Sequence, residues 1–136
     1  MDIRTVSVEK ELTIHAYDID AMGIVSNIVY VRWFEDLRTD FLKMTYPLEE
    51  MLKTKISPIL MHTEVDYQVP LTIFDKPIAR CWLSSMGNSS WEMTFEITVG
   101  DKIHCKGKQN GCFYDLLKKR VTRIPDPLRK AIMGEK

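Results

Sequence analysis

Two carboxylates, Asp18 and Asp20, lie one residue apart in this sequence, shortly before Gly23. Directly after them, the sequence changes to a run of apolar and aromatic residues with helical spacing. The free backbone amides at the start of a helix carry about half a positive charge in total, which keeps a nearby carboxylate ionised. The same amides can hold a developing oxyanion. A base beside an oxyanion site suits the hydrolysis of an acyl group.

Two other roles for the pair are open on spacing alone. Aspartate is favoured in turns and helix caps, and this is the more frequent role of such a pair. A D-x-D pair could also bind a divalent metal, although two carboxylates supply only part of the roughly six or more oxygen ligands that calcium takes. We therefore expect no metal site, and the spacing is compatible with both a turn role and a catalytic role.

The residues around the pair follow two different periods. Residues 4–16 alternate between apolar and polar, which predicts a strand with one exposed face. From residue 28 to residue 44 the apolar positions recur every three or four residues, which predicts a helix with one apolar stripe. The stripe consists of Tyr30, Trp33, Phe34, Leu37, Phe41 and Met44. Ser26 or Asn27 is the expected N-cap.

The rest of the chain predicts a short helix near residues 47–52, then strands, then a final helical turn. Alternation covers residues 65–71, 77–86, 91–99 and 103–115, and turn residues occupy 86–90 and 99–102. Such short connections imply an antiparallel sheet, and only the helix at 28–44 is long enough to cover its apolar face. We therefore predict an α+β fold, a five-stranded antiparallel sheet wrapped around one long central helix.

The composition is that of one soluble domain, which we expect to span residues 1–136, with 45% hydrophobic and 28% charged residues. The 19 basic residues balance 19 acidic ones, whereas nucleic-acid binders usually carry a basic excess, so no nucleic-acid partner is expected. The basic cluster LLKKRVTR at residues 116–123 is interpreted as a solvated strand end. No apolar run approaches the roughly 20 residues that span a bilayer.

The cysteines and histidines favour structural roles. The cysteines are Cys81, Cys105 and Cys112. They lack metal-ligand spacing, and an odd number without a readable secretory leader favours reduced thiols in the cytoplasm. His15, His62 and His104 are interpreted as surface or packing residues, with His104 on the exposed side of its strand. The sequence contains no G-x-S-x-G elbow and no Walker loop.

Residues 17–36, YDIDAMGIVSNIVYVRWFED, carry a motif that resembles a known active-site segment. It is similar to that of hotdog-fold acyl-CoA thioesterases of the 4-hydroxybenzoyl-CoA thioesterase-like group. Their pattern is D-x-D-x-x-G-[IHV]-V, then four residues, then Y-x-x-[WF]-[FL]-[ED]. VDYQVPLTIFD at 65–75 and TRIPDPLRKAI at 122–132 resemble the family's D-Y-x-x-P and R-I-P segments. The resemblance covers nearly the whole chain.

The resemblance implies a role for each matching position. Asp20 matches the family's catalytic carboxylate, which acts as nucleophile or as general base on water. Gly23 lets the loop turn tightly, and Asn27 matches the position whose backbone amide polarises the thioester carbonyl. Asp18 is then structural and holds the loop. Related enzymes often have HVNN where this chain has IVSN, so Ile24 replaces a histidine and the choice between the two mechanisms stays open.

Further residues are candidates for contact with acyl-CoA. Tyr30, one turn after the reaction centre, is expected to line the acyl pocket. By strand parity, Ile59 and Met61 share the inward face with Val65 and Tyr67, which makes them candidates for the acyl wall. The candidates for phosphate contacts are Arg80, Ser89, Ser90, Lys106 and Lys108. Plain solvated strand positions are an equally good interpretation of these five.

The resemblance implies an acyl-CoA thioester hydrolase that releases a carboxylic acid and free CoA. No cofactor is expected, because CoA is part of the substrate, and a homodimer or homotetramer is expected from the family and from the unprotected sheet edges. Two alternatives are a non-catalytic acyl-thioester-binding protein and a thioesterase for acyl carrier protein. A hotdog hydratase would need a histidine near the helix, and none lies between residues 16 and 61.

Overall fold

The apolar stripe forms helix α1 (Asn27–Thr45) in the computed structural model, which describes residues 6–133. The buried side chains of α1 are Val29, Tyr30, Trp33, Phe34, Leu37, Phe41 and Thr45. The prediction that Met44 belongs to this stripe is wrong, because its side chain is 61% exposed. Helical periodicity carries the buried face from Phe41 to Thr45, four residues on, and Met44 lies beside that face.

One antiparallel sheet lies against α1. Its strands are β1 (Ser7–Glu11), β2 (Ile56–Tyr67), β3 (Ile78–Met86), β4 (Ser90–Val99), β5 (Lys102–Asp115) and β6 (Arg120–Thr122). The order is β1-β3-β4-β5-β2, and β6 pairs with β5. The curled antiparallel sheet is confirmed, and β6 is an additional short strand within the basic segment that was interpreted as a strand end.

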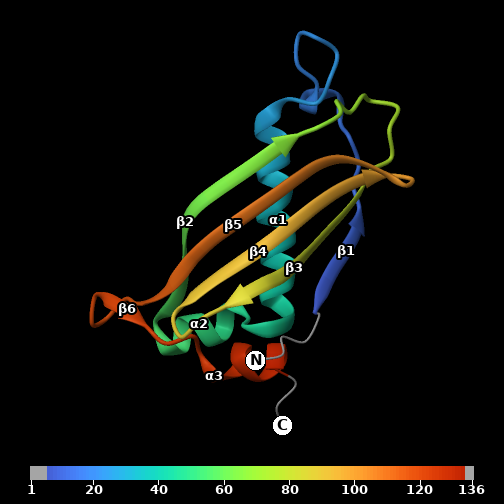
Figure 1. The fold of residues 1–136 in the computed structure, drawn as a ribbon. Coiled ribbons are helices and arrows are strands. Elements are labelled where there is room, and N and C mark those ends of the chain that lie inside the picture. Colours follow the sequence, from blue (N-terminus) through green and yellow to red (C-terminus); the bar gives the residue numbers. More distant parts are fainter. Residues whose placement is uncertain (1–5, 134–136) are drawn as a thin grey trace.

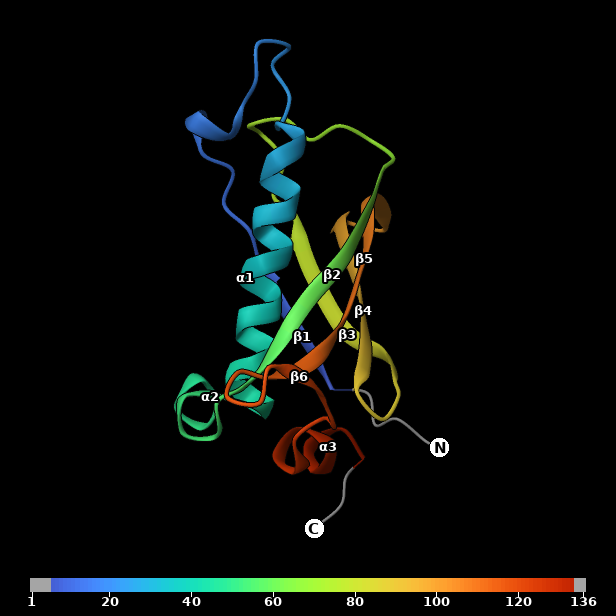
Figure 2. The same cartoon turned by 90° about the vertical axis from the view of Figure 1, so that its left-hand side faces the viewer.

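The helices are arranged along one face of the sheet. Figures 1 and 2 show α1 running along this face, with α2 (Leu48–Thr54) and α3 (Asp126–Met133) gathered where α1 ends. The loop before α1, which contains the short 3-10 helix η1 (Ala16–Asp18), lies at the opposite end of the molecule. The acidic pair is therefore separated from the C-terminal part of the chain by the length of α1.

An aromatic contact joins the middle of α1 to the sheet. Phe34 stacks on Phe95 of β4, with ring centroids 4.6 Å apart. Gly107 of β5 lies directly beneath the same ring, and a Cβ atom added there would be 2.3 Å from Phe34 Cε2. Because Gly107 has no side chain, the helix can approach the sheet closely at this point.

Strand pairing among residues 6–133 is interrupted by three register shifts, and two of them affect residues with a predicted orientation. The pairing of β2 with β5 shifts between Leu60 and His62, so the alternation reverses at Met61. Ile59 pairs with Cys112 on the outer face, and Met61 is 70% exposed. The prediction that Ile59 and Met61 share the inward face with Val65 and Tyr67 is therefore wrong.

The second irregularity concerns His104. The pairing of β4 with β5 shifts between Ile97 and Thr98. Ile97 pairs with Cys105 and Thr98 pairs with Ile103, so His104 has no partner on β4. His104 is buried instead of exposed, and its Nδ1 lies 3.2 Å from the carbonyl oxygen of Val69. Its predicted place on the exposed side is wrong, but its interpretation as a packing residue agrees with this contact.

Replacing Gly107 by alanine tests the close approach of helix and sheet. We expect Gly107→Ala to lower the free energy of unfolding by about 1–3 kcal/mol, because the new methyl group overlaps the Phe34 ring. Urea unfolding followed by circular dichroism measures this change. Lys108→Ala, on the exposed face of the same strand, is the control and should change stability little. Equal stability of Gly107→Ala and the wild type would contradict the proposed contact.

Candidate active site

The loop that leads into α1 is closed by backbone hydrogen bonds. Ile19 and Val25 form an antiparallel bridge, and between them the N–H of Asp20 donates to the carbonyl of Ile24 at 2.9 Å. The N–H of Gly23 donates back to the carbonyl of Asp20 at 3.0 Å. Gly23 has φ of 79°, in the left-handed region that glycine adopts without strain. These bonds hold Asp20 within a few residues of the helix start.

Asp18 fastens the base of this loop. It is buried, and its Oδ2 accepts a hydrogen bond from the N–H of His15 at 2.9 Å. Its carbonyl oxygen accepts from the N–H of Ser26, also at 2.9 Å. Both contacts are internal to the loop, in agreement with the structural role that the resemblance implies for Asp18.

Asp20 is exposed and bonds to its own loop. Its Oδ1 accepts from the N–H of Met22 at 2.8 Å and from that of Ile24 at 3.5 Å. Its Oδ2 has no hydrogen-bond partner among residues 6–133, so one carboxylate oxygen is fixed by the loop while the other is available. The amides that bind the Asp20 carboxylate here are those of the loop, and not those of the helix start.

The first amides of α1 are free. The N–H groups of Asn27 and Ile28 have no acceptor within the described part of the chain, and the first bonded amide is that of Val29, which donates to the carbonyl of Ser26 at 3.0 Å. Ser26, one of the two residues predicted as N-cap, is the N-cap of α1, but its side chain makes no capping hydrogen bond. Two backbone donors are therefore available at the tip of α1.

A hollow of about 130 Å³ adjoins this tip. It is lined by Ile24, Val25, Asn27, Tyr30, Tyr67, Val69 and Pro70. Tyr30 and Tyr67 meet edge to face, with ring centroids 5.2 Å apart, and the hydroxyl of Tyr67 donates to the carbonyl of Asn27 at 3.1 Å. The structure thus brings together Asn27 and the predicted pocket residue Tyr30.

The electrostatic setting keeps the nearby tyrosine and thiol groups neutral. Burial raises the pKa of Tyr30 from 10.0 to about 12. Burial also raises the pKa of the Cys81 and Cys105 thiols from 9.0 to about 12, which agrees with their interpretation as inert. Neither cysteine is therefore a thiolate near neutral pH, and neither lines the hollow.

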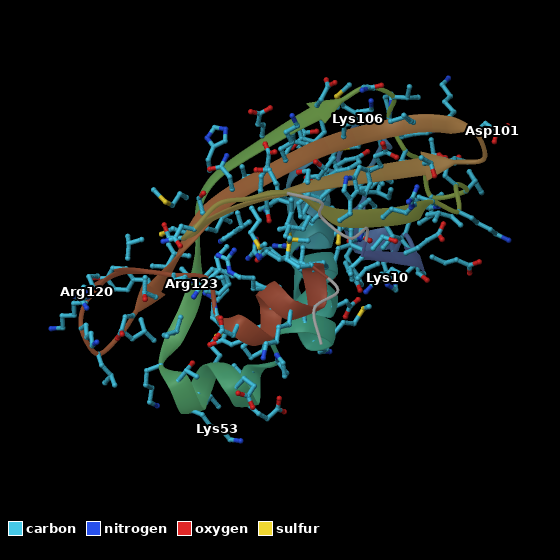
Figure 3. All side chains as sticks on the ribbon, turned by 60° about the horizontal axis from the view of Figure 1, so that its bottom comes forward. Lys10, Lys53, Asp101, Lys106, Arg120 and Arg123 are labelled. Atoms are coloured by element: carbon cyan, nitrogen blue, oxygen red, sulfur yellow. The ribbon has the colours of Figure 1, made fainter. Side chains whose placement is uncertain are left out.

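The predicted phosphate contacts lie on other surfaces. Arg80 and Lys106 both stand opposite Glu96 in the strand register on the outer face of the sheet, and Figure 3 shows Lys106 projecting from the side away from the helices. Lys108 lies on the same face and pairs with Thr94. Within one chain, these cations therefore lie on the face of the sheet opposite α1.

Ser89 and Ser90 are not near the hollow either. Ser89 belongs to the turn between β3 and β4, and Ser90 is the first residue of β4. In this turn the side chain of Arg129 in α3 donates to the carbonyl of Asn88 at 3.0 Å. α3 packs where α1 ends (Figure 1), whereas Asn27 is the first residue of α1. Because a helix of 19 residues is about 28 Å long, this turn and the hollow lie at opposite ends of α1.

The remaining histidines lie on the surface. His15 stacks on the Tyr17 ring, with centroids 4.8 Å apart, and His62 pairs with Glu64 at 3.5 Å. Among residues 6–133 no group of three histidine, cysteine, aspartate or glutamate side chains is placed to hold a metal ion. Within the same range, no helix has the length and apolar character needed to cross a bilayer.

Tyr67 is the residue of this site that sequence reasoning missed. The sequence pattern predicts Tyr67 on the inward face, which its pairing with buried Cys105 supports, but assigns it no role in the site. A signal was present, because Tyr67 is the tyrosine of the D-Y-x-x-P segment, and Pro70 of that segment also lines the hollow.

Comparison with known families gives one match that covers most of the chain. The model of the thioesterase-like superfamily matches residues 14–132. Among curated proteins, no match was found.

Solved structures of other proteins share the fold. A hypothetical protein from Staphylococcus aureus, solved in complex with CoA, has a TM-score of 0.89 at 12% identity and covers 99% of this chain and 87% of its own. A 1,4-dihydroxy-2-naphthoyl-CoA thioesterase from Synechocystis has a TM-score of 0.83 at 14% identity, with coverage of 94% and 96%. A gentisyl-coenzyme A thioesterase has a TM-score of 0.78 at 20% identity, with coverage of 90% and 99%. At these identities the similarity establishes the fold.

The raised pKa of Tyr30 predicts a loss of stability in alkali. The folded protein favours the neutral phenol, so this contribution is complete below pH 10 and is lost as the pH rises through about 12. We expect the free energy of unfolding of Tyr30→Phe to fall less steeply between these values than that of the wild type. Urea unfolding at a series of pH values measures the slopes. Tyr17→Phe, at an exposed tyrosine, is the control, and identical slopes for Tyr30→Phe and the wild type would contradict the prediction.

Proposed function

The chain belongs to the thioesterase-like superfamily, and from this membership we propose that it hydrolyses acyl-CoA thioesters to a carboxylic acid and free CoA. The observation that carries the proposal is the pair of amides at the start of α1, Asn27 and Ile28, which have no acceptor among residues 6–133. They adjoin a hollow and lie a few residues from the exposed carboxylate of Asp20. Donors for an oxyanion, space for an acyl group and a base thus occupy one end of the molecule.

The helix start supplies the electrostatic part of the reaction. The thioester carbonyl oxygen accepts hydrogen bonds from the N–H groups of Asn27 and Ile28. When the carbonyl carbon becomes tetrahedral, this oxygen gains negative charge, which fixed N–H dipoles stabilise more than they stabilise the neutral carbonyl. The effect lowers the barrier without any movement of the protein.

Asp20 supplies the attacking group in one of two ways. As a general base, its Oδ2 takes a proton from a water that attacks the carbonyl carbon, and the C–S bond then breaks to release CoA. As a nucleophile, Oδ2 attacks the carbon itself to give a mixed anhydride and CoA thiolate, and water then hydrolyses the anhydride. Both routes use the oxygen that the loop leaves unbonded, while the bonds to Met22 and Ile24 hold the other.

The substrate proposal rests on the similar structures. Two are named for aromatic acyl-CoA substrates and a third contains CoA, which favours CoA over acyl carrier protein as the carrier group. Tyr30 and Tyr67 form the aromatic wall of the hollow, and we propose that they contact the acyl group. This chemistry requires only the acyl-CoA substrate and water, and we propose no cofactor.

Asp20→Asn is the direct test. The amide can neither take a proton nor attack the thioester, so we expect kcat to fall by a factor of about 100 or more. Thiol release from aromatic, short-chain and long-chain acyl-CoA, followed with a thiol-reactive dye, measures the rate. The reading of enzyme alone is subtracted, because Cys112 is partly exposed. Asp36→Asn, at an exposed position on α1, is the control and should keep the wild-type rate.

The same panel separates hydrolysis from binding alone. Full activity of Asp20→Asn would reject the role of Asp20. Tight binding of acyl-CoA by the wild type without turnover of any member would instead support the non-catalytic acyl-thioester-binding alternative.

We also propose that the chain works as a homodimer or homotetramer. β1 and β2 are the edges of the sheet, and two exposed apolar side chains, Met22 (81%) and Phe74 (88%), lie in the loops at the end of the molecule where α1 begins. A second copy packed there would withdraw this surface, and Asp20 with it, from solvent. Light scattering should therefore give a mass of twice or four times 15.9 kDa, and a monomeric mass would contradict the proposal.

A further inference from the structure

We propose that Tyr67 is a positioning residue of this site, whose hydroxyl fixes and polarises the peptide group that joins Asn27 to Ile28. This inference rests on the proposed function, because the N–H of that peptide group belongs to Ile28, one of the two amides assigned to the oxyanion. In this scheme the ring of Tyr67 lies against the acyl group, whereas its hydroxyl acts only through the Asn27–Ile28 peptide group and does not touch the reacting atoms.

The contact joins two segments that lie far apart in the sequence. Tyr67 is the last residue of β2 and Asn27 is the first residue of α1, and the hydroxyl of Tyr67 donates to the carbonyl of Asn27 at 3.1 Å across 40 residues. The Tyr67 ring is held by its edge-to-face contact with Tyr30, whose side chain is buried in the core. The first turn of α1 is thereby attached to the edge strand of the sheet.

The direction of this hydrogen bond matters for the amide. A carbonyl oxygen can only accept, so Tyr67 is the donor. The C=O of Asn27 and the N–H of Ile28 form one resonance-stabilised peptide group. A hydrogen bond to the oxygen draws electron density from the nitrogen and makes the N–H a stronger donor, which is the cooperativity seen in hydrogen-bonded chains.

The two free amides are supported in different ways. The N–H of Asn27 belongs to the peptide group of the Ser26 carbonyl, which accepts from the N–H of Val29 at 3.0 Å. The Ser26 carbonyl is polarised by the helix backbone. The Asn27 carbonyl, which shares a peptide group with the N–H of Ile28, also accepts from the side chain of Tyr67. A single substitution can therefore weaken one donor of the pair and leave the other intact.

Tyr67 remains a donor over the working range of pH. Burial raises the pKa of its phenol above the ordinary value of 10.0, and the neighbouring Cys105 acts in the same direction. The hydroxyl therefore stays protonated near neutral pH. The hydrogen bond to Asn27 is accordingly not expected to titrate in the range where the proposed hydrolysis would be assayed.

Tyr67→Phe tests the inference, since it keeps the ring against Tyr30 and removes only the hydroxyl. We expect kcat to fall about 5- to 20-fold with KM little changed, which is less than the roughly 100-fold loss when an oxyanion donor is removed altogether. Tyr114→Phe, at the end of β5, is the matched control and should keep the wild-type kcat. An unchanged kcat, or a rise in KM alone, would overturn the role.

A second measurement does not depend on activity. In the nuclear magnetic resonance spectrum, the amide proton of Ile28 should move upfield in Tyr67→Phe, whereas 3-fluorotyrosine at position 67, a stronger donor, should move it downfield. No movement in either variant would overturn the polarisation. If the wild type hydrolyses no thioester, the proposed function fails while this readout still reports on the contact. If the wild type is active and Tyr67→Phe matches it, only the present inference fails.

Discussion

The packing of α1 onto the sheet at Phe34 is the contact on which the rest of this structure depends. Phe34 stacks on Phe95 and lies directly over Gly107, so the distance between helix and sheet is set by an aromatic ring on one side and a missing side chain on the other. Burying a phenylalanine contributes about 1.5–3 kcal/mol, and a stacked aromatic pair about 0.5–1.5 kcal/mol more. Because the helix is rigid, fixing it at Phe34 also fixes its first residue, two turns earlier.

That fixed helix start brings three kinds of chemistry to one place. The free amides of Asn27 and Ile28 come from the helix, the carboxylate of Asp20 from the closed loop before it, and the aromatic wall from Tyr30 and Tyr67. The loop is kept short by the left-handed backbone at Gly23. The oxyanion site that we propose consists of backbone groups and needs this kind of support, because an amide can be aimed only by holding the chain on both sides of it.

The two faces of the sheet differ in the polar groups that they carry. The face toward α1 is apolar apart from a few bonded groups, such as Gln109, whose amide nitrogen lies 3.4 Å from Glu35 and 3.4 Å from Thr63. The outer face alternates in sign where Glu96 pairs with Arg80 and with Lys106. Opposite charges that stand across from one another on neighbouring strands favour a solvated sheet face. Because side chains alternate between the two faces of a strand, these cations project away from the hollow.

The sequence by itself determined most of the elements and the acidic loop before the helix, because hydrophobic period and turn chemistry depend on near neighbours. The strand predicted at 65–71 is an exception, because β2 runs from Ile56 to Tyr67. The sequence predicted α1 to within one residue at each end, and it placed Asp20, Gly23 and Asn27 in one segment. Only the tertiary structure decided that Met61 leaves the inward face, that His104 is buried, and that Tyr67 reaches the helix start. A bulge depends on the partner strand, and a hydrogen bond across 40 residues depends on where the helix lies on the sheet, which no local pattern contains.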